Sequence, residues 1–230
     1  MKTGNQQKVG VIIVAAGSSR RMDGTDKVLA LLDGESILVR VVDVFQRCTP
    51  IDQIVVVLSE QNLERGKQLV IEQGWSKVID VCVGGRRRQD SVAAGLRRLS
   101  SCNWVVIHDG ARPLVTVDLI DRGLEAAKET GAAVAAVPVT DTIKTAGDNK
   151  IVRQTPPRQN LWAVQTPQIF GIKIITESYS RVSGNVTDDA SLVEQLGYRV
   201  KIYMGSYDNI KITTPDDLAL AEVLWRKYER

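Results

Sequence analysis

The sequence predicts one α/β domain spanning residues 1–230, with a doubly wound, mostly parallel, Rossmann-like sheet, helices on both faces and a protruding β-arm. Two observations support this fold class. β-branched apolar runs alternate with segments of helical periodicity, which is the pattern of parallel strands joined by right-handed crossovers. The alternation stops between Thr140 and Gln168, where short extended segments and prolines replace the helical period.

The first half of the chain consists of predicted strands and helices in alternation. The opening strand is the apolar run that begins at Val9, and its nearly continuous hydrophobicity indicates a central strand covered on both faces. Ser36 then caps a helix whose apolar residues recur at helical spacing. The elements expected next are the strand Ile54–Leu58, the helix Glu60–Gln73 ended by Gly74, the strand Val78–Val83, a helix through Leu99 and the strand Trp104–His108.

The second half begins with a further predicted helix and strand, and the alternation of strands and helices is then interrupted by the β-arm. A helix from about Thr116 to Thr130 ends at Gly131, because glycine readily adopts the left-handed conformation that terminates helices. The run Thr213–Asp217 starts the final helix with a capping threonine, a proline in the first turn and acidic residues that the helix dipole favours. The other predicted elements are the strand Ala132–Val139, the helix Ile172–Arg181, a helix after the loop Asn185–Asp189, the strand Arg199–Tyr203 and the short strand Asn209–Ile212.

The β-arm at about residues 140–168 is predicted to mediate dimerisation. A lone hairpin cannot bury its own apolar side chains, and this arm carries several. A second subunit would cover them, so we expect a homodimer, and light scattering that gave a monomer would contradict it. The apolar arm residues are Ile143, Ile151, Val152, Leu161 and Trp162.

Composition excludes several classes of protein. Apolar residues make up 43% of the chain and charged residues 25%, which is ordinary for a soluble globular enzyme. The formal net charge of +3 is too small to indicate a nucleic-acid partner. No apolar run approaches the roughly 18 residues of a membrane span and no signal segment precedes the first strand, so we expect the cytoplasm and no membrane. The three cysteines share no CxxC spacing, which argues against zinc or disulfides.

The loop after the first strand has the features of a phosphate-binding site. It combines small residues with Arg20, Arg21 and Lys27, and it lies at the carboxyl end of a central strand, where ligands bind in open α/β sheets. Neither the dinucleotide fingerprint nor the spacing of a P-loop is present. The alternative is an ordinary strand-to-helix turn whose basic residues face solvent.

Further candidate residues are expected beside this loop. The segment Gly84–Ser91 follows the third strand with glycines and arginines, so it is predicted to form a second wall of the same crevice. Asp109, at the carboxyl end of another strand, could hold Mg²⁺ on a triphosphate or simply form a turn. Asp208 is the predicted second metal ligand, again with a turn as the alternative. His108, the single histidine, would point to the opposite face and is expected to be structural, so any metal must be held mainly by carboxylates.

Seven short motifs follow one another along nearly the whole chain. They are AAGSSRRM with Lys27, GGRRRQDSV, HDGARP, PVTDTIK, QTPQ, VTDDAS and DNIKIT-x-P-DDL. Together they resemble the successive motifs of the 2-C-methyl-D-erythritol 4-phosphate cytidylyltransferase family. Seven motifs at consistent intervals are far more specific than any one glycine loop.

The resemblance implies one nucleotidyltransferase domain and a particular reaction. The phosphate oxygen of 2-C-methyl-D-erythritol 4-phosphate would attack the α-phosphorus of CTP in line, releasing pyrophosphate and forming 4-diphosphocytidyl-2-C-methyl-D-erythritol. This is a step of non-mevalonate isoprenoid synthesis. Mg²⁺ or another divalent cation would assist, which agrees with the physical demands of such transfers, since they need mainly positioning and charge stabilisation.

The resemblance also implies roles for individual residues. The implied nucleotide-binding residues are Ala15, Ala16, Gly17, Gly85, Arg86 and Ser91. The implied catalytic residues are Arg21, Lys27 and Lys211. The implied substrate-binding residues are Asp109, Arg112, Thr142, Arg158, Thr166, Thr187 and Lys211. Thr142 and Arg158, on the arm, would reach into the neighbouring subunit's site, and Asp109 and Asp208 would hold the metal.

The chain departs from the family pattern at three places. Asp26-Lys27-Val28 stands where the family commonly has Pro-Lys-Gln, Ser19 replaces a frequent glycine, and Arg86 replaces a frequent acidic residue. Lys27 itself is retained, so the implied role of this lysine in catalysis still holds.

Two alternative functions are compatible with part of the sequence pattern. Ribitol 5-phosphate cytidylyltransferase would share the fold, CTP and metal, but its opening loop more often reads LAGG and its later motif departs from TDDAS. A non-catalytic nucleotide-binding module would not need the set formed by Lys27, Asp109 and Asp208. Methylerythritol phosphate is therefore the predicted substrate.

Overall fold

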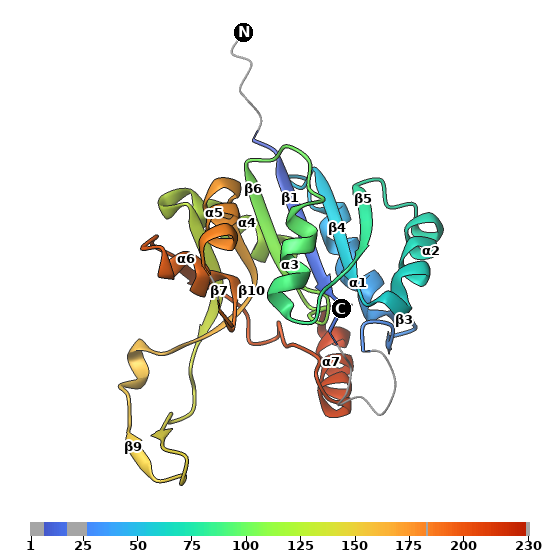
Figure 1. The fold of residues 1–230 in the computed structure, drawn as a ribbon. Coiled ribbons are helices and arrows are strands. Elements are labelled where there is room, and N and C mark those ends of the chain that lie inside the picture. The colour runs from blue at the N-terminus through green and yellow to red at the C-terminus, as the bar shows by residue number, and fades with distance from the viewer. Residues whose placement is uncertain (1–6, 18–26, 183, 229–230) are drawn as a thin grey trace.

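A mostly parallel sheet forms the centre of the structure (Figure 1). The computed structural model describes residues 7–17, 27–182 and 184–228. Within them the sheet has seven strands in the order β11-β7-β10-β6-β1-β4-β5, and only β10 is antiparallel to its neighbours. The fold class predicted from the sequence is confirmed. The strands are β1 Val9–Ala15, β4 Gln53–Leu58, β5 Val78–Val83, β6 Trp104–Asp109, β7 Ala132–Pro138, β10 Trp162–Gly171 and β11 Lys201–Met204.

Strand β1 lies between β6 and β4 and is parallel to both. Val11 is opposite Val106 on one side and Ile54 on the other. All residues of β1 except Val14 are buried, which explains its continuous apolar run. The chain runs outward from β1 through β4 to β5 and then crosses back to β6, so the carboxyl ends of β1 and β6 flank a topological switch point. Ligands bind at such points in open α/β sheets.

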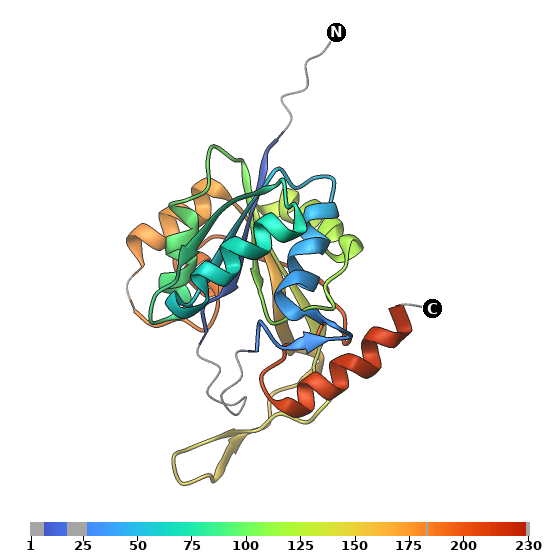
Figure 2. The ribbon, with the colours of Figure 1, turned by 90° about the vertical axis from the view of Figure 1, so that its right-hand side faces the viewer.

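Helices cover both faces of the sheet, as predicted (Figure 2). One face is covered by α1 Ile37–Arg47, α2 Leu63–Gln73 and α4 Val117–Thr130. The other is covered by α3 Arg88–Leu96, α5 Ile172–Arg181 and α6 Asp189–Gln195. Phe45 of α1 and Val92 of α3 are both fully buried, one in the core of each face. In the described part of the chain, no helix is long and apolar enough to span a membrane.

The predicted capping residues set the helix boundaries. The Ser36 hydroxyl accepts a hydrogen bond from the backbone N–H of Val39 at 3.3 Å, which begins α1. Gly74 and Gly131 end α2 and α4 with φ values of 63° and 86°, a conformation that favours glycine. The helix predicted from Glu60 starts as a 3-10 turn, η1 Glu60–Asn62, and continues as α2.

The last helix lies beyond the carboxyl ends of the strands (Figure 1). This helix, α7 Pro215–Tyr228, is capped by the Thr214 hydroxyl, which accepts the Asp217 N–H at 3.3 Å. It packs near a small hairpin of β2 Leu31–Leu32 and β3 Glu35–Ser36. This hairpin was not predicted, because such short strands leave no periodic signal in the sequence.

The segment Asn209–Ile212 does not form the predicted strand. It is a loop whose Ile212 N–H donates to the Ala111 carbonyl at 2.8 Å, and Ile212 is fully buried. This apolar anchor holds the preceding Lys211 beside the end of β6.

The β-arm leaves the sheet at the end of β7 and returns into β10. It contains a small hairpin, β8 Thr145–Ala146 with β9 Val152–Gln154, and a 3-10 turn, η2 Arg158–Asn160. The predicted arm extends to Gln168, whereas residues from Trp162 onward belong to β10 and pair with β7 and β6. Sequence periodicity missed this strand because its register shifts between Val164 and Gln168, where Pro167 interrupts the pattern.

Candidate active site

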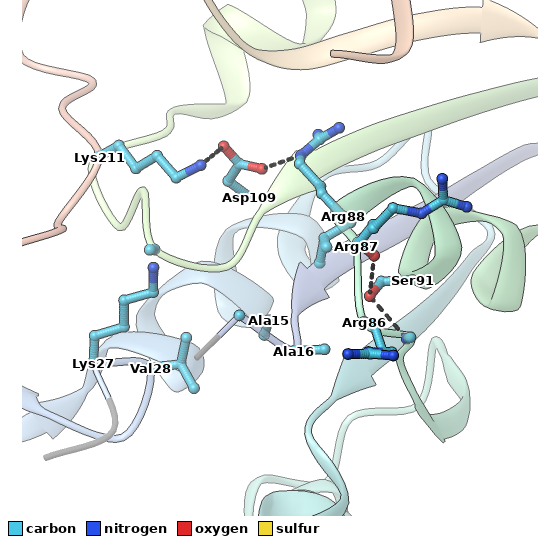
Figure 3. A pocket seen from close by; sticks show the side chains of 14 residues that line it. Ala15, Ala16, Lys27, Val28, Arg86, Arg87, Arg88, Ser91, Asp109 and Lys211 are labelled. Carbon is cyan, nitrogen blue, oxygen red and sulfur yellow. Dashed lines mark hydrogen bonds and ion pairs between the residues drawn. The ribbon is translucent and has the colours of Figure 1, made fainter. Parts of the chain in front are cut away.

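A cavity of about 400 Å³ lies at the carboxyl ends of β1 and β6, closed on one side by the turn after β5 (Figure 3). It is the crevice that the sequence predicted between the first loop and the Gly84–Ser91 segment. The predicted site residues that line it are Ala15, Ala16, Gly17, Lys27, Gly85, Arg86, Ser91, Asp109 and Lys211. Arg21 lies outside the described residues.

Small residues give this cavity its shape. A Cβ atom added to Gly84 would lie 2.4 Å from the Ala16 Cβ and 2.6 Å from the Ser91 Oγ, so only glycine fits between β1 and α3. The Ser91 hydroxyl accepts from the Gly85 N–H at 3.1 Å and donates to the Arg87 carbonyl at 3.3 Å. Ser91 therefore holds the turn in place, which is a structural contribution beside the predicted contact with a nucleotide.

Positive charge surrounds the cavity. The Lys27 Nζ lies 3.8 Å from the position that a Cβ on Gly17 would occupy, so its ammonium is placed directly over the backbone at the end of β1. Figure 3 shows Arg86 on the other side of Ala15 and Ala16. Backbone groups flanked by cations are suited to an anion such as a nucleotide phosphate.

A second cavity, of about 460 Å³, adjoins the first. Both are lined by Arg88, Asp109 and Lys211, which form the wall between them. The predicted substrate-binding residues that line the second cavity are Asp109, Arg112, Thr166, Thr187 and Lys211. Two anionic compounds, one in each cavity, would therefore lie next to each other with Arg88, Asp109 and Lys211 between them.

Asp109 is the electrostatic centre of this wall. Its Oδ1 accepts from Arg88 Nε at 3.0 Å, and its Oδ2 lies 2.9 Å from Lys211 Nζ and 3.6 Å from Arg112 Nε. Figure 3 shows Lys211 and Arg88 on opposite sides of the carboxylate. Burial alone would raise the pKa of Asp109, but the three cations outweigh it and hold the pKa well below its ordinary value. Asp109 is thus ionised at any physiological pH.

His108 faces away from the cavities, as predicted from strand alternation. It is fully buried, with its ring centroid 5.2 Å from that of Phe45. Its Nε2 lies 3.2 Å from the Arg112 carbonyl, which can only accept, so Nε2 carries the proton and Nδ1 accepts from the Thr166 hydroxyl at 3.1 Å. Burial lowers the pKa of His108 to about 3 against the opposing charge of Asp109, so the ring is neutral.

Thr166 is held between His108 and Asp109. Besides donating to the histidine, its hydroxyl accepts from the Asp109 backbone N–H at 3.0 Å. The Asn209 amide donates to the Thr166 carbonyl at 2.8 Å, and the Asn209 carbonyl accepts from Arg112 at 2.7 Å. These bonds tie the loop that carries Lys211 to the strand end that carries Asp109.

Asp208, Thr142 and Arg158 are not among the described residues that line the two cavities. The Asp208 carboxylate is 3.7 Å from Lys227 Nζ. Thr142 and Arg158 are exposed on the arm, where Arg158 Nη1 donates to the Thr140 carbonyl at 2.6 Å.

The residues present supply at most part of a metal site. In the described ranges, no three His, Cys, Asp or Glu side chains are grouped as ligands for a metal ion. Mg²⁺ in nucleotide sites needs only one or two protein carboxylates, because phosphate oxygens and waters complete its shell. Asp109 is a carboxylate that lines both cavities, and its two oxygens pair with Arg88 and Lys211.

Several side chains that line or adjoin the two cavities were not predicted as site residues from the sequence. Arg88 joins both cavities and pairs with Asp189 at 2.6 Å as well as with Asp109. Gln168 donates to Asp188 at 2.9 Å beside the second cavity. Arg88 lies in the arginine run, and Asp188-Asp189 lies in a capping sequence, so both segments could be located in the sequence. The ion pair between Arg88 and Asp189 joins residues about 100 positions apart, and no local pattern predicts it.

Comparison with known proteins decides the family. The family model described as 2-C-methyl-D-erythritol 4-phosphate cytidylyltransferase matches residues 9–227. The chain belongs to this family. A cytidylyltransferase of this name from Dehalococcoides mccartyi is 54% identical over 221 residues, covering 96% of this chain and 97% of its own. Another, from Alkaliphilus oremlandii, is 47% identical over 225 residues and covers 95% of each chain.

Solved structures of cytidylyltransferases share the fold. The 4-diphosphocytidyl-2C-methyl-D-erythritol synthase of Anaerococcus prevotii has a TM-score of 0.86 at 30% identity, covering 96% of this chain and all of its own. The cytidylyltransferase of Thermus thermophilus has a TM-score of 0.76 at 32% identity, covering 95% and 99%. The resemblance stated from the sequence is confirmed. Of its departures, Ser19 and Asp26 lie outside the described residues, while Arg86 lines the first cavity.

Proposed function

We propose that this cytidylyltransferase joins CTP to 2-C-methyl-D-erythritol 4-phosphate, giving 4-diphosphocytidyl-2-C-methyl-D-erythritol and pyrophosphate in non-mevalonate isoprenoid synthesis. The observation that carries the proposal is the pair of adjoining cavities that share Arg88, Asp109 and Lys211. CTP occupies the cavity at the end of β1, and the sugar phosphate occupies the cavity beside Thr166. The phosphate of one substrate then faces the triphosphate of the other.

The reaction is an in-line displacement at phosphorus. A phosphate oxygen of the sugar forms a bond to the α-phosphorus of CTP, and the bond from that phosphorus to the β-bridging oxygen breaks, so pyrophosphate leaves with the electron pair. Such a transfer asks the protein for positioning and for stabilisation of the charge on the equatorial oxygens. Lys27, Lys211 and Arg21 are the groups that we assign to charge stabilisation.

Backbone and small side chains of the first cavity hold the nucleotide. Ala15, Ala16 and Gly17 let phosphates approach the end of β1, and the turn at Gly85 and Arg86, held by Ser91, receives the cytosine and ribose. The close contact between Gly84 and Ala16 keeps this space small. A pyrimidine fits such a pocket better than a purine.

The second cavity holds the sugar phosphate. Arg112 and Lys211 supply positive charge for its phosphate, and Thr187 is a further lining residue. The Thr166 hydroxyl is shared between His108 and the Asp109 N–H, so its contribution is to orient the end of β6.

A divalent cation, with magnesium expected, belongs to this proposal. Asp109 and, from the loop beyond β11, Asp208 are the carboxylates assigned to hold it with the triphosphate. When bound, it neutralises charge on the phosphates. A homodimer and a cytoplasmic location also stay predictions, and in the dimer Thr142 and Arg158 of each arm serve the neighbouring site.

The experiment that tests the proposal follows pyrophosphate release with a panel of nucleoside triphosphates and sugar phosphates. We expect release with CTP, Mg²⁺ and 2-C-methyl-D-erythritol 4-phosphate, and its loss in the Asp109→Asn variant. No release with any of these pairs would favour the non-catalytic nucleotide-binding module. Faster turnover of ribitol 5-phosphate would replace the proposed substrate with that of the alternative enzyme.

A further inference from the structure

A buried series of side chains links α5 and α6 to the wall between the two cavities. Asp189, the first residue of α6, is 1% exposed. Its Oδ1 accepts from the Tyr179 hydroxyl of α5 at 2.6 Å, and its Oδ2 accepts from Arg88 Nη1 at 2.6 Å. The Nε of the same arginine donates to Asp109 at 3.0 Å. A carboxylate from outside the cavities thus fixes a cation that lines both of them.

Arg88 depends on these two carboxylates for its position. Its Nη2 is buried without a hydrogen-bond partner among the described residues, so the other two nitrogens hold the guanidinium. A buried charge that loses one of its partners is strongly disfavoured. If Asp189 lost its charge, Arg88 would depend on Asp109 alone for charge compensation.

A loss of the charge on Asp189 would also affect Asp109 and Lys211, which line the two cavities. Asp109 divides its two oxygens between Arg88 on one side and Lys211 with Arg112 on the other. An Arg88 released by Asp189 would draw closer to Asp109 and compete with Lys211 for the carboxylate. The wall between the cavities would then be rearranged, and small displacements of positioning groups can cost a large factor in rate.

We propose that Asp189 is a positioning residue of the transfer reaction, which with Tyr179 holds Arg88 so that Asp109 and Lys211 face the two cavities in their working arrangement. The proposal rests on the function proposed above. It assigns to α6 a part in catalysis through Arg88, without contact between Asp189 and either substrate.

The test compares two substitutions of the same residue. Asp189→Asn keeps the size and can still accept a hydrogen bond but removes the charge, whereas Asp189→Glu keeps the charge. We expect kcat to fall by about 10- to 100-fold in Asp189→Asn, while the Kd for CTP, measured by calorimetry, changes by less than about threefold. Asp189→Glu should recover part of the lost kcat. The matched control is Asp80→Asn, which removes the partner of Arg98 in an exposed ion pair and should leave kcat unchanged.

Three results would contradict a positioning role for Asp189. A folded Asp189→Asn variant with wild-type kcat would overturn the proposal. Equal losses in Asp189→Asn and Asp189→Glu would also count against it, because the negative charge kept in Asp189→Glu would then not restore any of the lost kcat. If Asp189→Asn fails to fold, Tyr179→Phe removes one hydrogen bond from the same carboxylate and should lower kcat several-fold without changing CTP affinity; an unchanged kcat there refutes the role. Absence of turnover in the wild-type protein would instead count against the proposed function.

Discussion

At the scale of single residues, Lys27 places a cation over the backbone at the end of β1. Its ammonium lies over Gly17 and lines the cavity assigned to CTP. In Lys27→Ala we expect kcat to fall by about 10²- to 10³-fold, because a fixed group that stabilises developing charge is lost. Pyrophosphate release measures the effect. Lys67→Ala, on the exposed face of α2, is the control, and an equal loss there would mean that general charge rather than position matters.

His108 makes stability depend on pH. Burial lowers its folded pKa to about 3 from an ordinary value of 6.5, so the unfolded chain binds the proton more readily. The resulting stabilisation is fully present above pH 6.5 and is lost as the pH falls toward 3. Between about pH 7.5 and about pH 5 the free energy of unfolding should drop by about 2 kcal/mol from this residue alone.

Urea unfolding at the two pH values tests this dependence. The His108→Gln variant has no titrating ring, so its stability should fall by about 2 kcal/mol less than that of the wild type over the same interval. Parallel pH profiles of the two proteins would show that His108 is not the residue that titrates.

At the scale of elements, the turn after β5 packs closely against the end of β1 and against α3, and this packing shapes the cavity assigned to CTP. Gly84→Ala would place a Cβ 2.4 Å from Ala16 and push the turn that Ser91 holds. We expect CTP affinity, measured by calorimetry, to weaken by at least about tenfold, because the turn can no longer keep its position. Gly171→Ala is the matched control, since its added Cβ would meet nothing closer than 3.6 Å. Equal affinity in both variants would contradict the role of this contact.

At the scale of the whole molecule, the arm carries apolar side chains that the rest of the described chain leaves exposed. Ile151 and Val152 are 64% and 54% exposed, as expected of a surface that a second copy covers. If Arg158 serves the neighbouring site, two inactive variants should complement each other. Lys27→Ala and Arg158→Ala subunits, unfolded together and refolded as a mixture, should recover about one quarter of wild-type turnover, because half of the dimers carry one complete site.

Separately refolded variants are the control for complementation. If the mixture is no more active than the mean of the two variants alone, Arg158 does not act in the partner's site. Light scattering on the same samples reports whether dimers form at all.

Local signals in the sequence were sufficient for most of the fold. Apolar runs, capping residues such as Ser36 and helix-ending glycines such as Gly74 act over a few residues, so they predicted nearly every element of the sheet and its helices. The hairpin of β2 and β3 and the strand β10 were missed. Their pairing depends on a turn and on a register shift at Pro167 that carry no regular period.

The sequence by itself determined the family, the parallel sheet and the residues at the ends of its strands, because these depend on local patterns and on motifs of fixed order. The tertiary structure decided which of those residues meet. It places Arg88 between Asp109 and Asp189, and it brings Arg88, Asp109 and Lys211 together as the wall between two cavities. Such contacts join positions about 20 and about 100 residues apart, and the folded sheet alone brings them within hydrogen-bond distance.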